Sequence, residues 1–463
     1  MIEADAVICG AGIAGIAAAH ALVRDAHLSR VIIVEQGAPL SLTSDKSTEC
    51  YRNWWPGPDN AMTALSCRSI SLMEALASNT GNAIVMDRRG YLYLSEDVDS
   101  AESFAQQARS AESLGAGALR IHESAATNYA NASGMRHDAS LHGADLLLGS
   151  AHIQQRFPWL NPGTRAALHV RRAGALSAQQ LGMVLLQQAR EGGAQIMSGT
   201  LTQIDCDGSG AVSGVRVDDG QQVHVIRTRC VIDAAGPYVT DVAKLVNVSL
   251  PVYCERHVKL SFNDIESVLP RDAPLSIWCD PTPLPWNEDE RDALLADVDD
   301  SPAGSSDSAA LLAPYPAGVH GRPIGAGQSV ILYWTYDCPI ETPHFPVIWD
   351  ASYPEIVLRG MSVMIPGLSA YYERMPNAFV DGGYYTKTAE NRPLIGPTTV
   401  EGFYLCGAFS GFGIMMAMGA GELVAAQAQG QPLPDYAHHF ELSRYDDPTY
   451  RDTMADVGAA GQL

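Results

Sequence analysis

The feature that most limits the fold is a glycine-rich turn near the N-terminus, between the apolar segment ADAVIC and the segment IAGIAAAHALVRDA. Gly10, Gly12 and Gly15 have the spacing GxGxxG, and a second apolar segment, VIIVE, ends at Glu35. In this arrangement the first glycine permits a tight turn, the second lets the backbone approach a pyrophosphate, and the third lets helix and strand pack closely. The segment therefore predicts a Rossmann-like strand–helix–strand unit that binds a nucleotide.

The same turn indicates which groups would face the ligand. The start of the helix presents N–H groups and a partial positive charge to phosphates. The carboxylate of Glu35 can bind ribose hydroxyls and disfavours a 2′-phosphate. FAD and NAD share an adenosine diphosphate half, so this motif does not choose between them, and a tight turn without a ligand is the alternative interpretation. The candidate contacts are Gly10, Gly12, Ile13, Ala14, Gly15, Glu35 and Gln36.

Charge and cysteine usage narrow the class of protein. The 463 residues include 30 Lys and Arg against 52 Asp and Glu, which gives a formal net charge of −22. This balance argues against nucleic acid and anionic membrane surfaces as partners. The nine cysteines are dispersed without a CxxC pair, and the thirteen histidines show no metal-ligand spacing. We expect free thiols in a reducing compartment, no metal site, no membrane span and a cytoplasmic location.

A second glycine-punctuated turn, GAFSGFGIMMAMGAGEL, occupies residues 407–423 and leads into an Ala- and Met-rich helix. Between the two turns, the pattern predicts helices at residues 64–77 and 180–196, and a strand near residues 196–204 that begins a hairpin. The segments GYLYLS, CVIDAAGPYV and GFYLCGAF predict further strands. Polar residues 296–310 predict a surface loop.

Taken together, these segments resemble the D-amino-acid oxidase-like (DAO) family of FAD-dependent oxidoreductases, on the branch with sarcosine oxidase and glycine oxidase. The resemblance rests on the first glycine turn with its terminal acid, the TxT strand at residues 200–202, and the segments AAGPYV, YYTKTAENRPLIGP and SGFG, in the family's order over nearly the whole chain. It implies an α/β fold, in which a Rossmann-like FAD-binding domain accompanies an α+β substrate domain with a mixed sheet. It implies that residues 1–80, 165–245 and 376–435 form the FAD-binding domain, residues 81–164 and 246–375 the substrate domain, and residues 436–463 a C-terminal tail.

The resemblance gives the second turn a role that electrostatics supports. Oxidation of a substrate leaves negative charge on the flavin ring, and a helix N-terminus aimed at that edge stabilises the charge. Gly383 stands where some relatives have the cysteine that links FAD covalently, which implies non-covalent FAD. The further cofactor-binding residues implied are Lys46, Ser47, Thr48, Thr202, Ala235, Gly236, Gly411, Phe412, Gly413, Ile414 and Met415.

Candidate substrate residues follow from the same matching segments. Arg52 matches an arginine that binds the substrate carboxylate in sarcosine-oxidising relatives, and a structural ion pair is the alternative. Tyr385 matches an active-site tyrosine, and a buried core aromatic is the alternative. His257 lies on the strand that enters the substrate domain, where a structural role is the competing interpretation. Four aromatic residues are candidates for an apolar pocket wall or for the core: Trp54, Trp55, Trp334 and Tyr336.

Two departures from the family pattern bear on the substrate. Met415 stands where sarcosine-type relatives have a second carboxylate-binding lysine. An ungapped alignment places Ile331 where sarcosine-type relatives have the lysine that promotes the reaction of reduced flavin with oxygen. Because of the first departure, the sequence does not decide whether the substrate is a small N-methyl amino acid. Because of the second, it does not decide whether oxygen is the electron acceptor. We expect a larger or less anionic substrate, bound against Met415.

The sequence therefore predicts a FAD-dependent amine or amino-acid oxidase or dehydrogenase. It would oxidise a C–N bond of a secondary, N-alkyl or D-amino acid, or of an amine, to an imine by hydride transfer to flavin N5, and pass electrons to oxygen or another carrier. Oxidation of a hydroxy acid or polyol phosphate, and a non-catalytic flavin-binding scaffold, are the alternatives. An NAD(P)-linked dehydrogenase is disfavoured because it gives the second glycine turn no role.

Overall fold

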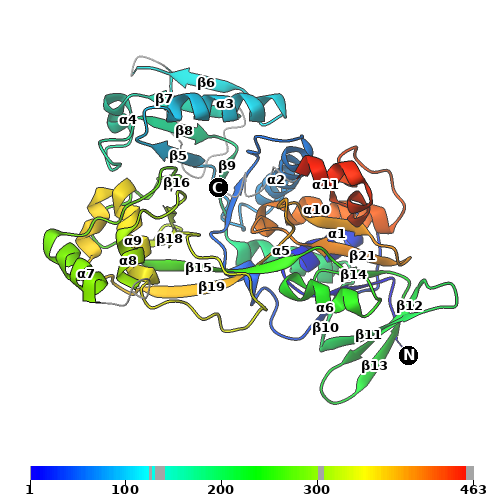
Figure 1. The fold of residues 1–463 in the computed structure, drawn as a ribbon. Helices are drawn as coiled ribbons and strands as arrows, with labels where there is room; N and C mark the ends of the chain where they lie inside the picture. Colours follow the sequence, from blue (N-terminus) through cyan, green and yellow to red (C-terminus); the bar gives the residue numbers. More distant parts are fainter. Residues whose placement is uncertain (1, 125–127, 131–140, 301–306, 455–463) are drawn as a thin grey trace.

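The computed structural model describes residues 2–124, 128–130, 141–300 and 307–454. In this part of the chain, the two largest sheets have six and nine strands, and each organises one unit of the molecule (Figure 1). Two long strands, β15 (Tyr253–Asn263) and β19 (Phe379–Lys387), belong to the nine-stranded sheet and reach toward the other unit (Figure 1). The site described below lies where they arrive.

The six-stranded sheet has the order β10–β3–β2–β14–β21–β20, and its strands are parallel except for β20. Its strands are β10 (Gln195–Ser198), β3 (Val31–Glu35), β2 (Ala6–Cys9), β14 (Val231–Asp233), β21 (Phe403–Gly407) and β20 (Leu394–Pro397). Side chains alternate between two buried faces, so Ile8 joins one core and Val7 the other. This is a doubly covered parallel sheet, as the first glycine turn predicts.

Each face of this sheet has its own cover. One face packs on α1 (Ile13–Arg24), α2 (Ala61–Asn79), α5 (Ala178–Glu191) and α10 (Gly413–Ala428). The other packs on α6 (Val239–Lys244) and a four-stranded sheet of β1 (Ile2–Glu3), β13 (Val223–Arg227), β12 (Val212–Asp218) and β11 (Thr200–Cys206). The helices that follow the two glycine turns, α1 and α10, lie side by side on the same face.

The nine-stranded sheet is mixed and has the order β19–β15–β18–β17–β16–β5–β8–β7–β6. Its remaining strands are β18 (Ser329–Tyr333), β17 (His320–Pro323), β16 (Leu275–Trp278), β5 (Tyr91–Ser95), β8 (Ala166–Val170), β7 (Ala144–Leu148) and β6 (Leu119–His122). On β5, Leu92 and Leu94 pack into a core with α4 (Ser150–Arg156) and α9 (Tyr353–Met364), whereas Tyr91 and Tyr93 pack toward α3 (Ser100–Ser113).

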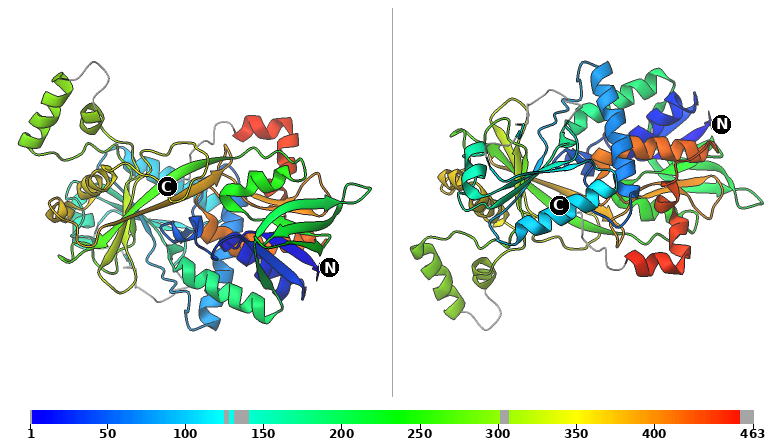
Figure 2. Two further views of the ribbon diagram at one scale, coloured as in Figure 1. Left: turned by 90° about the horizontal axis from the view of Figure 1, so that it is seen from below. Right: turned by 90° about the horizontal axis from the view of Figure 1, so that it is seen from above.

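The predicted helices and strands are present as α2, α5, β5, β10 and β11, but the helix predicted at residues 180–196 ends at Glu191, and two further expectations need correction. The domain boundaries at 165 and 376 do not follow the sheets, because β8 and β19 pair within the nine-stranded sheet. The surface loop predicted at 296–310 overlaps α7 (Glu288–Asp300) and α8 (Asp307–Leu312), which project from the body (Figure 2). Acidic residues in the first turn stabilise α7, and residues 301–306 lie outside the described residues.

The C-terminal segment is folded back onto the six-stranded unit as far as it is described. Ala437 and Phe440 are buried in the core around α10, and α11 (Pro448–Met454) follows (Figure 2). Residues 455–463 of the expected tail lie outside the described residues. Within the described chain, no helix has the length and apolarity needed to cross a membrane.

Candidate active site

The first glycine turn is held by backbone contacts that tolerate no side chain at two of its glycines. Gly10 has φ of +101°, and a Cβ there would lie 2.6 Å from the Ala234 carbonyl oxygen on the neighbouring strand connection. A Cβ on Gly15 would lie 2.0 Å from the carbonyl oxygen of Gly10. By contrast, a Cβ on Gly12 would meet only the Ser44 hydroxyl, at 3.4 Å. The outer two glycines close the turn, and the middle one leaves space in front of it.

Glu35 reinforces the turn from the end of β3. Its Oε2 accepts a hydrogen bond from the backbone N–H of Ala11 at 2.7 Å, and its Oε1 accepts one from Gly37 at 2.8 Å. The carboxylate is therefore fixed beside the turn, as the sequence predicts, while Gln36 is exposed. The Ser44 hydroxyl accepts from the N–H of Ile13 at 3.0 Å, which is the first residue of α1.

The second glycine turn is strained and opens into the same space as the first. Ala408, Ser410 and Gly411 have φ of +56°, +51° and +90°, a conformation that costs free energy for residues with a side chain. Helix α10 begins at Gly413, and no described side chain caps its N-terminus. A cavity of about 100 Å³, which we call the turn cavity, is lined by Gly12, Ile13 and Ala14 of the first turn and by residues 407–411, 413 and 414 of the second.

A second cavity, which we call the ring cavity, adjoins the turn cavity and has a volume of about 70 Å³. The two cavities share five lining residues: Ser47, Tyr385, Ser410, Gly411 and Ile414. Thr48, Arg52, Phe412 and Met415 also line the ring cavity. The expectation of a larger or less anionic substrate stays a prediction.

Arg52, on β4 (Cys50–Arg52), is the cation of the ring cavity. It is 3 % exposed, and its Nε donates to the Trp54 carbonyl oxygen at 3.3 Å. Its guanidinium carbon lies 4.7 Å from the ring of Trp55 and 5.7 Å from that of Phe412. The flat faces of these rings stabilise the charge and hold the guanidinium in place. The guanidinium is therefore held on the wall of the ring cavity, beside the second glycine turn.

Four rings on neighbouring strands form one wall of the ring cavity. They are His320 on β17, Tyr333 on β18, His257 on β15 and Tyr385 on β19, and we call them the ring row. The ring centroids of His257 and Tyr385 are 3.9 Å apart and nearly parallel, and those of His320 and Tyr333 are 5.0 Å apart. Burial raises the pKa of the Tyr385 phenol to about 12. The row therefore presents protonated phenols to the cavity near neutral pH.

His257 has both ring nitrogens engaged away from the cavity. Its Nε2 lies 3.2 Å from Glu255 Oε2, and its Nδ1 lies 3.6 Å from the sulfur of Cys338. Lys387 donates to the same Glu255 oxygen at 2.9 Å. Atoms of Glu255, His257 and Cys338 that could bind a metal ion lie within 4.8 Å of one another. However, Glu255 and Cys338 approach opposite nitrogens of the His257 imidazole. The arrangement is that of a hydrogen-bonded network, in which Lys387 supplies the positive charge.

Several residues predicted for the site lie elsewhere. Thr202 is exposed on β11, and its hydroxyl donates to the Arg216 carbonyl oxygen at 3.3 Å. Lys46 forms an ion pair with Asp381 at 2.8 Å and does not line either cavity. Tyr336 is half-buried and packs against the core under the nine-stranded sheet, beside Tyr353.

Trp54 and Trp334 are core residues rather than cavity walls, and Trp55 reaches the site through its contact with Phe412. Gly236 lines the turn cavity, whereas Ala235 does not. Ile331 is buried on β18, beside Tyr333 but outside the ring cavity. These positions follow from strand pairing between distant segments, which the sequence pattern does not determine.

Sequence reasoning missed His320, Tyr333 and Glu49, which all line the ring cavity. Tyr333 follows Ile331 in the apolar run VILYW, and that run was the available signal for a buried strand. His320 lies directly opposite Tyr333 in the antiparallel pair of β17 and β18. The two strands are joined by the turn IGAGQ, residues 324–328, and the sequence pattern does not fix the register across it.

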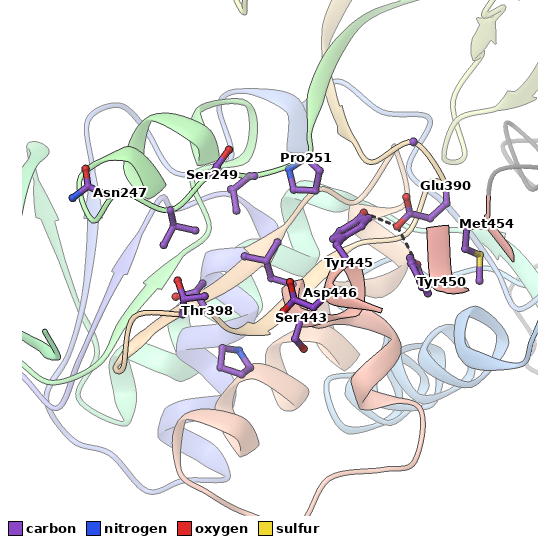
Figure 3. Close-up of a pocket in the computed structure, with 16 residues that line it drawn as sticks. Asn247, Ser249, Pro251, Glu390, Thr398, Ser443, Tyr445, Asp446, Tyr450 and Met454 are labelled. Atoms are coloured by element: carbon purple, nitrogen blue, oxygen red, sulfur yellow. Dashed lines mark hydrogen bonds between the residues drawn. The ribbon is translucent and has the colours of Figure 1, made fainter. Parts of the chain in front are cut away.

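Another cavity of the described chain, about 860 Å³, lies at a different place, between residues 247–251 and the C-terminal segment (Figure 3). Its buried carboxylate, Glu390, accepts hydrogen bonds from Tyr445 and Tyr450 (Figure 3), and also from Arg444. Among the described residues that line this cavity there is no Lys, Arg or His. This cavity offers little chemistry, and the ring cavity remains the candidate active site.

Comparison with known proteins agrees with this geometry. The profile of a family described as FAD dependent oxidoreductase (DAO) matches residues 5–427. Among solved structures, the chain is similar to L-proline dehydrogenase from P. horikoshii, with 18 % identity, a TM-score of 0.70, and 98 % and 99 % of the two chains covered. It is also similar to glycine oxidase from Geobacillus kaustophilus, with 16 % identity, a TM-score of 0.71, and 96 % and 99 % covered.

A third similar structure is iminodiacetate oxidase from Chelativorans sp. BNC1, with 17 % identity, a TM-score of 0.67, and 94 % and 98 % of the two chains covered. No curated protein matches the sequence. At these identities the structures show the fold, and the chemistry must be argued from this chain's own residues.

Proposed function

Because the chain belongs to the family of FAD-dependent oxidoreductases, we propose that it oxidises the C–N bond of a small amine or amino acid to an imine, which water then hydrolyses. A secondary, N-alkyl or D-amino acid is the substrate class. The observation that carries this proposal is that the ring cavity, with its positioned Arg52, opens directly onto the turn cavity between the two glycine turns.

The residues present fit FAD. A Cβ at Gly12 or Gly413 would make only ordinary van der Waals contacts, the nearest at 3.4 and 3.7 Å, so these positions keep room in front of both helix N-termini. The hydroxyl of Ser410 is buried, faces both cavities and has no hydrogen-bond partner in the described chain. Residues of the first turn and Glu35 would hold the adenosine diphosphate half, and the N-terminus of α10 would face the flavin ring. Bound FAD supplies the hydride acceptor.

The chain's own residues bind and orient the substrate. Arg52 would bind a carboxylate, since a buried guanidinium presents several N–H donors in one plane. Tyr385 and Met415 flank the space between the cavities and would limit how the substrate lies. Tyr336 has no place in this scheme, because it lines neither cavity.

Oxidation of a hydroxy acid, the second candidate, needs a base that removes the hydroxyl proton as the hydride leaves. Burial lowers the pKa of His320 to about 4, so protonating it at pH 7 costs about 4 kcal/mol. His257 has both nitrogens engaged, and Glu49 is hydrogen-bonded to the Ala178 N–H at 2.9 Å. An amine that binds in its neutral form needs no such base, because its nitrogen lone pair becomes part of the C=N bond as the hydride leaves. Of the described residues that line the cavity, Arg52 alone is permanently cationic, which disfavours a polyol phosphate.

The test is an anaerobic titration of the FAD-loaded protein with amines, amino acids and 2-hydroxy acids, in which the flavin absorbance is recorded after each addition. Bleaching by amines or amino acids, and not by hydroxy acids, is the expected result. Bleaching by hydroxy acids alone would favour the second candidate, and no bleaching by any compound would favour a non-catalytic scaffold. Readmission of air then tests whether oxygen or another carrier accepts the electrons.

The place of action is a further part of the proposal. All nine cysteines are free. Free thiols at this number are typical of a reducing compartment, which supports the cytoplasm.

A further inference from the structure

A groove of about 780 Å³, which we call the acidic groove, lies between α3 and the ends of β5 and β16. The carboxylates of Asp97, Asp99 and Asp280 line it, and no Lys, Arg or His does so among the described residues. A surface lined by one sign of charge raises the local concentration of ligands of the opposite sign. The groove therefore attracts cations and repels anions.

The acidic groove and the ring cavity follow each other along one face of the nine-stranded sheet. On β5, Tyr91 lines the ring cavity, and Tyr93, two residues later, lines the groove. On the neighbouring strand β16, Ile277 lines the ring cavity and pairs directly with Tyr93. Side chains two residues apart on a strand share a face and stand about 7 Å apart, and neighbouring strands are about 5 Å apart. The wall between the two spaces is therefore about one side chain thick.

A second part of the chain connects the same two spaces. Arg52 lines the ring cavity, and Pro56, four residues later, lines the acidic groove. Burial raises the pKa of the Tyr93 phenol to about 12, against an opposing effect of the nearby Arg52 charge. Tyr93 therefore stands between the cation of the ring cavity and the carboxylates of the groove, and its phenol is neutral near pH 7.

No hydrogen bond holds Tyr93 in its place in this wall. The residue is 6 % exposed, and its hydroxyl is buried without a hydrogen-bond partner in the described chain. A buried hydroxyl without a partner costs free energy, and this cost is recovered when the ring turns toward the groove and the hydroxyl meets water. Side-chain rotamer changes of this kind are common at binding sites. Turning Tyr93 out of the wall therefore breaks no hydrogen bond and allows one to form.

We propose that the acidic groove is the entrance to the ring cavity, and that a cationic amine reaches the flavin from it by passing Tyr93 as this side chain turns. This inference rests on the proposed function and adds to it the charge that the substrate carries on entry. Amines are protonated in water near pH 7, whereas 2-hydroxy acids are anions. The three carboxylates of the groove therefore select by charge before a molecule meets the ring cavity.

The rates at which small molecules reach the flavin test the entrance. The probes are tert-butylamine, a cation without a hydrogen on the carbon next to nitrogen, and sulfite, an anion that binds reversibly to flavins. Stopped-flow absorbance of the FAD-loaded protein without oxygen gives the association and dissociation rate constants of each probe. The amine has no hydride to give from that carbon, so the measurement does not depend on the proposed reaction.

One pair of variants separates entry from binding. Ser103 is exposed in the groove on α3, and Ser113 is exposed on the same helix outside the groove. In Ser103→Trp we expect association and dissociation of both probes to slow about tenfold, with the dissociation constant changed less than about twofold, because a narrowed entrance slows both directions equally. Ser113→Trp is the control and should change neither rate. Unchanged rates in Ser103→Trp, or a loss of affinity without slower association, would overturn the inference.

Two further changes test the wall and the charge. Tyr93→Ala removes the ring between the spaces and should speed both directions about tenfold. Asp97→Asn combined with Asp99→Asn should slow the association of tert-butylamine and speed that of sulfite, each about threefold at low salt, with both effects lost at high salt. A change of the same sign for both probes would contradict selection by charge.

The entrance and the proposed function fail in different ways. If amines bleach the flavin but Ser103→Trp alters no rate, the proposed function stands and the entrance is refuted. If the slowed rates are found but no amine bleaches the flavin, the entrance stands and the proposed function fails. If neither probe perturbs the flavin of the wild-type protein, the groove does not lead to the flavin and the inference is wrong.

Discussion

The two sheets that meet at the site contribute different kinds of groups to it. The six-stranded sheet contributes backbone: two glycine turns, and the N-termini of α1 and α10 on one face of the sheet. The nine-stranded sheet contributes side chains: the ring row, which crosses four adjacent strands. A wall made of backbone depends on the absence of Cβ atoms, whereas a wall made of side chains depends on their chemistry. Cofactor retention and substrate choice should therefore respond to different mutations.

The strongest way to break the backbone wall is Gly15→Ala, because the new Cβ would lie 2.0 Å from the Gly10 carbonyl oxygen. We expect the free energy of unfolding to fall by about 3 kcal/mol or more, with loss of bound FAD. Urea unfolding and the FAD content of the purified protein measure both effects. Gly208→Ala is the control, since a Cβ there meets nothing within 4 Å and should change neither quantity.

Mutations in the side-chain wall and its surroundings should instead change substrate specificity. Arg52→Gln is expected to raise the KM of carboxylate-bearing substrates about 100-fold, which corresponds to the loss of a buried charged hydrogen bond of about 2.7 kcal/mol. The KM of amines without a carboxylate should change less than about threefold, and FAD content should stay constant. Steady-state kinetics with paired substrates measures this, and an equal rise in both KM values would show that Arg52 is structural.

The stability of the nine-stranded sheet should also depend on pH, through a carboxylate that lies away from the site. Burial raises the pKa of Asp145, but hydrogen bonds from Arg120 and the charge of Arg171 outweigh it and lower the pKa to about 2. Because the folded pKa is below the unfolded value of 3.8, this stabilisation is full above pH 4 and is lost as the pH falls toward 2. We expect about 2 kcal/mol of acid-dependent stability from this group.

Urea unfolding at pH 5, 4, 3 and 2.5 would measure this contribution. In Asp145→Asn the pH dependence should be shallower by about that amount, although the variant is less stable at every pH. The exposed Asp272→Asn is the control and should keep the wild-type slope. A wild-type slope in Asp145→Asn would show that other carboxylates dominate acid unfolding.

The smallest effect is expected from Tyr385→Phe, which keeps the ring stacked on His257 and removes one hydroxyl. Loss of one hydrogen bond of about 1 kcal/mol predicts a three- to tenfold slower flavin reduction with FAD content unchanged. Stopped-flow absorbance measures this rate. A drop of a thousandfold would instead make the hydroxyl a participant in the chemistry.

The same contrast explains how much of the molecule the sequence predicts. The first turn with Glu35 and the start of α10 are each local in sequence, so their glycine spacing predicts their conformation. The meeting of the two turns at one cavity is a long-range feature, which the sequence implies only through the family resemblance. The ring row depends on the register between strands as distant as β15 and β19, which local patterns do not contain. For that reason local patterns do not identify His320, and Tyr336 and Thr202, which the sequence suggests for the site, lie elsewhere.

The central claim is that the cavity beside the second glycine turn oxidises a C–N bond. Its most direct test is the absorbance spectrum of the FAD-loaded protein, recorded anaerobically before and after addition of N-methylglycine, a D-amino acid and a 2-hydroxy acid with matched side chains. The account predicts loss of the visible flavin bands with the amino compounds and no change with the hydroxy acid. Bleaching by the hydroxy acid with the amino compounds inert would contradict it.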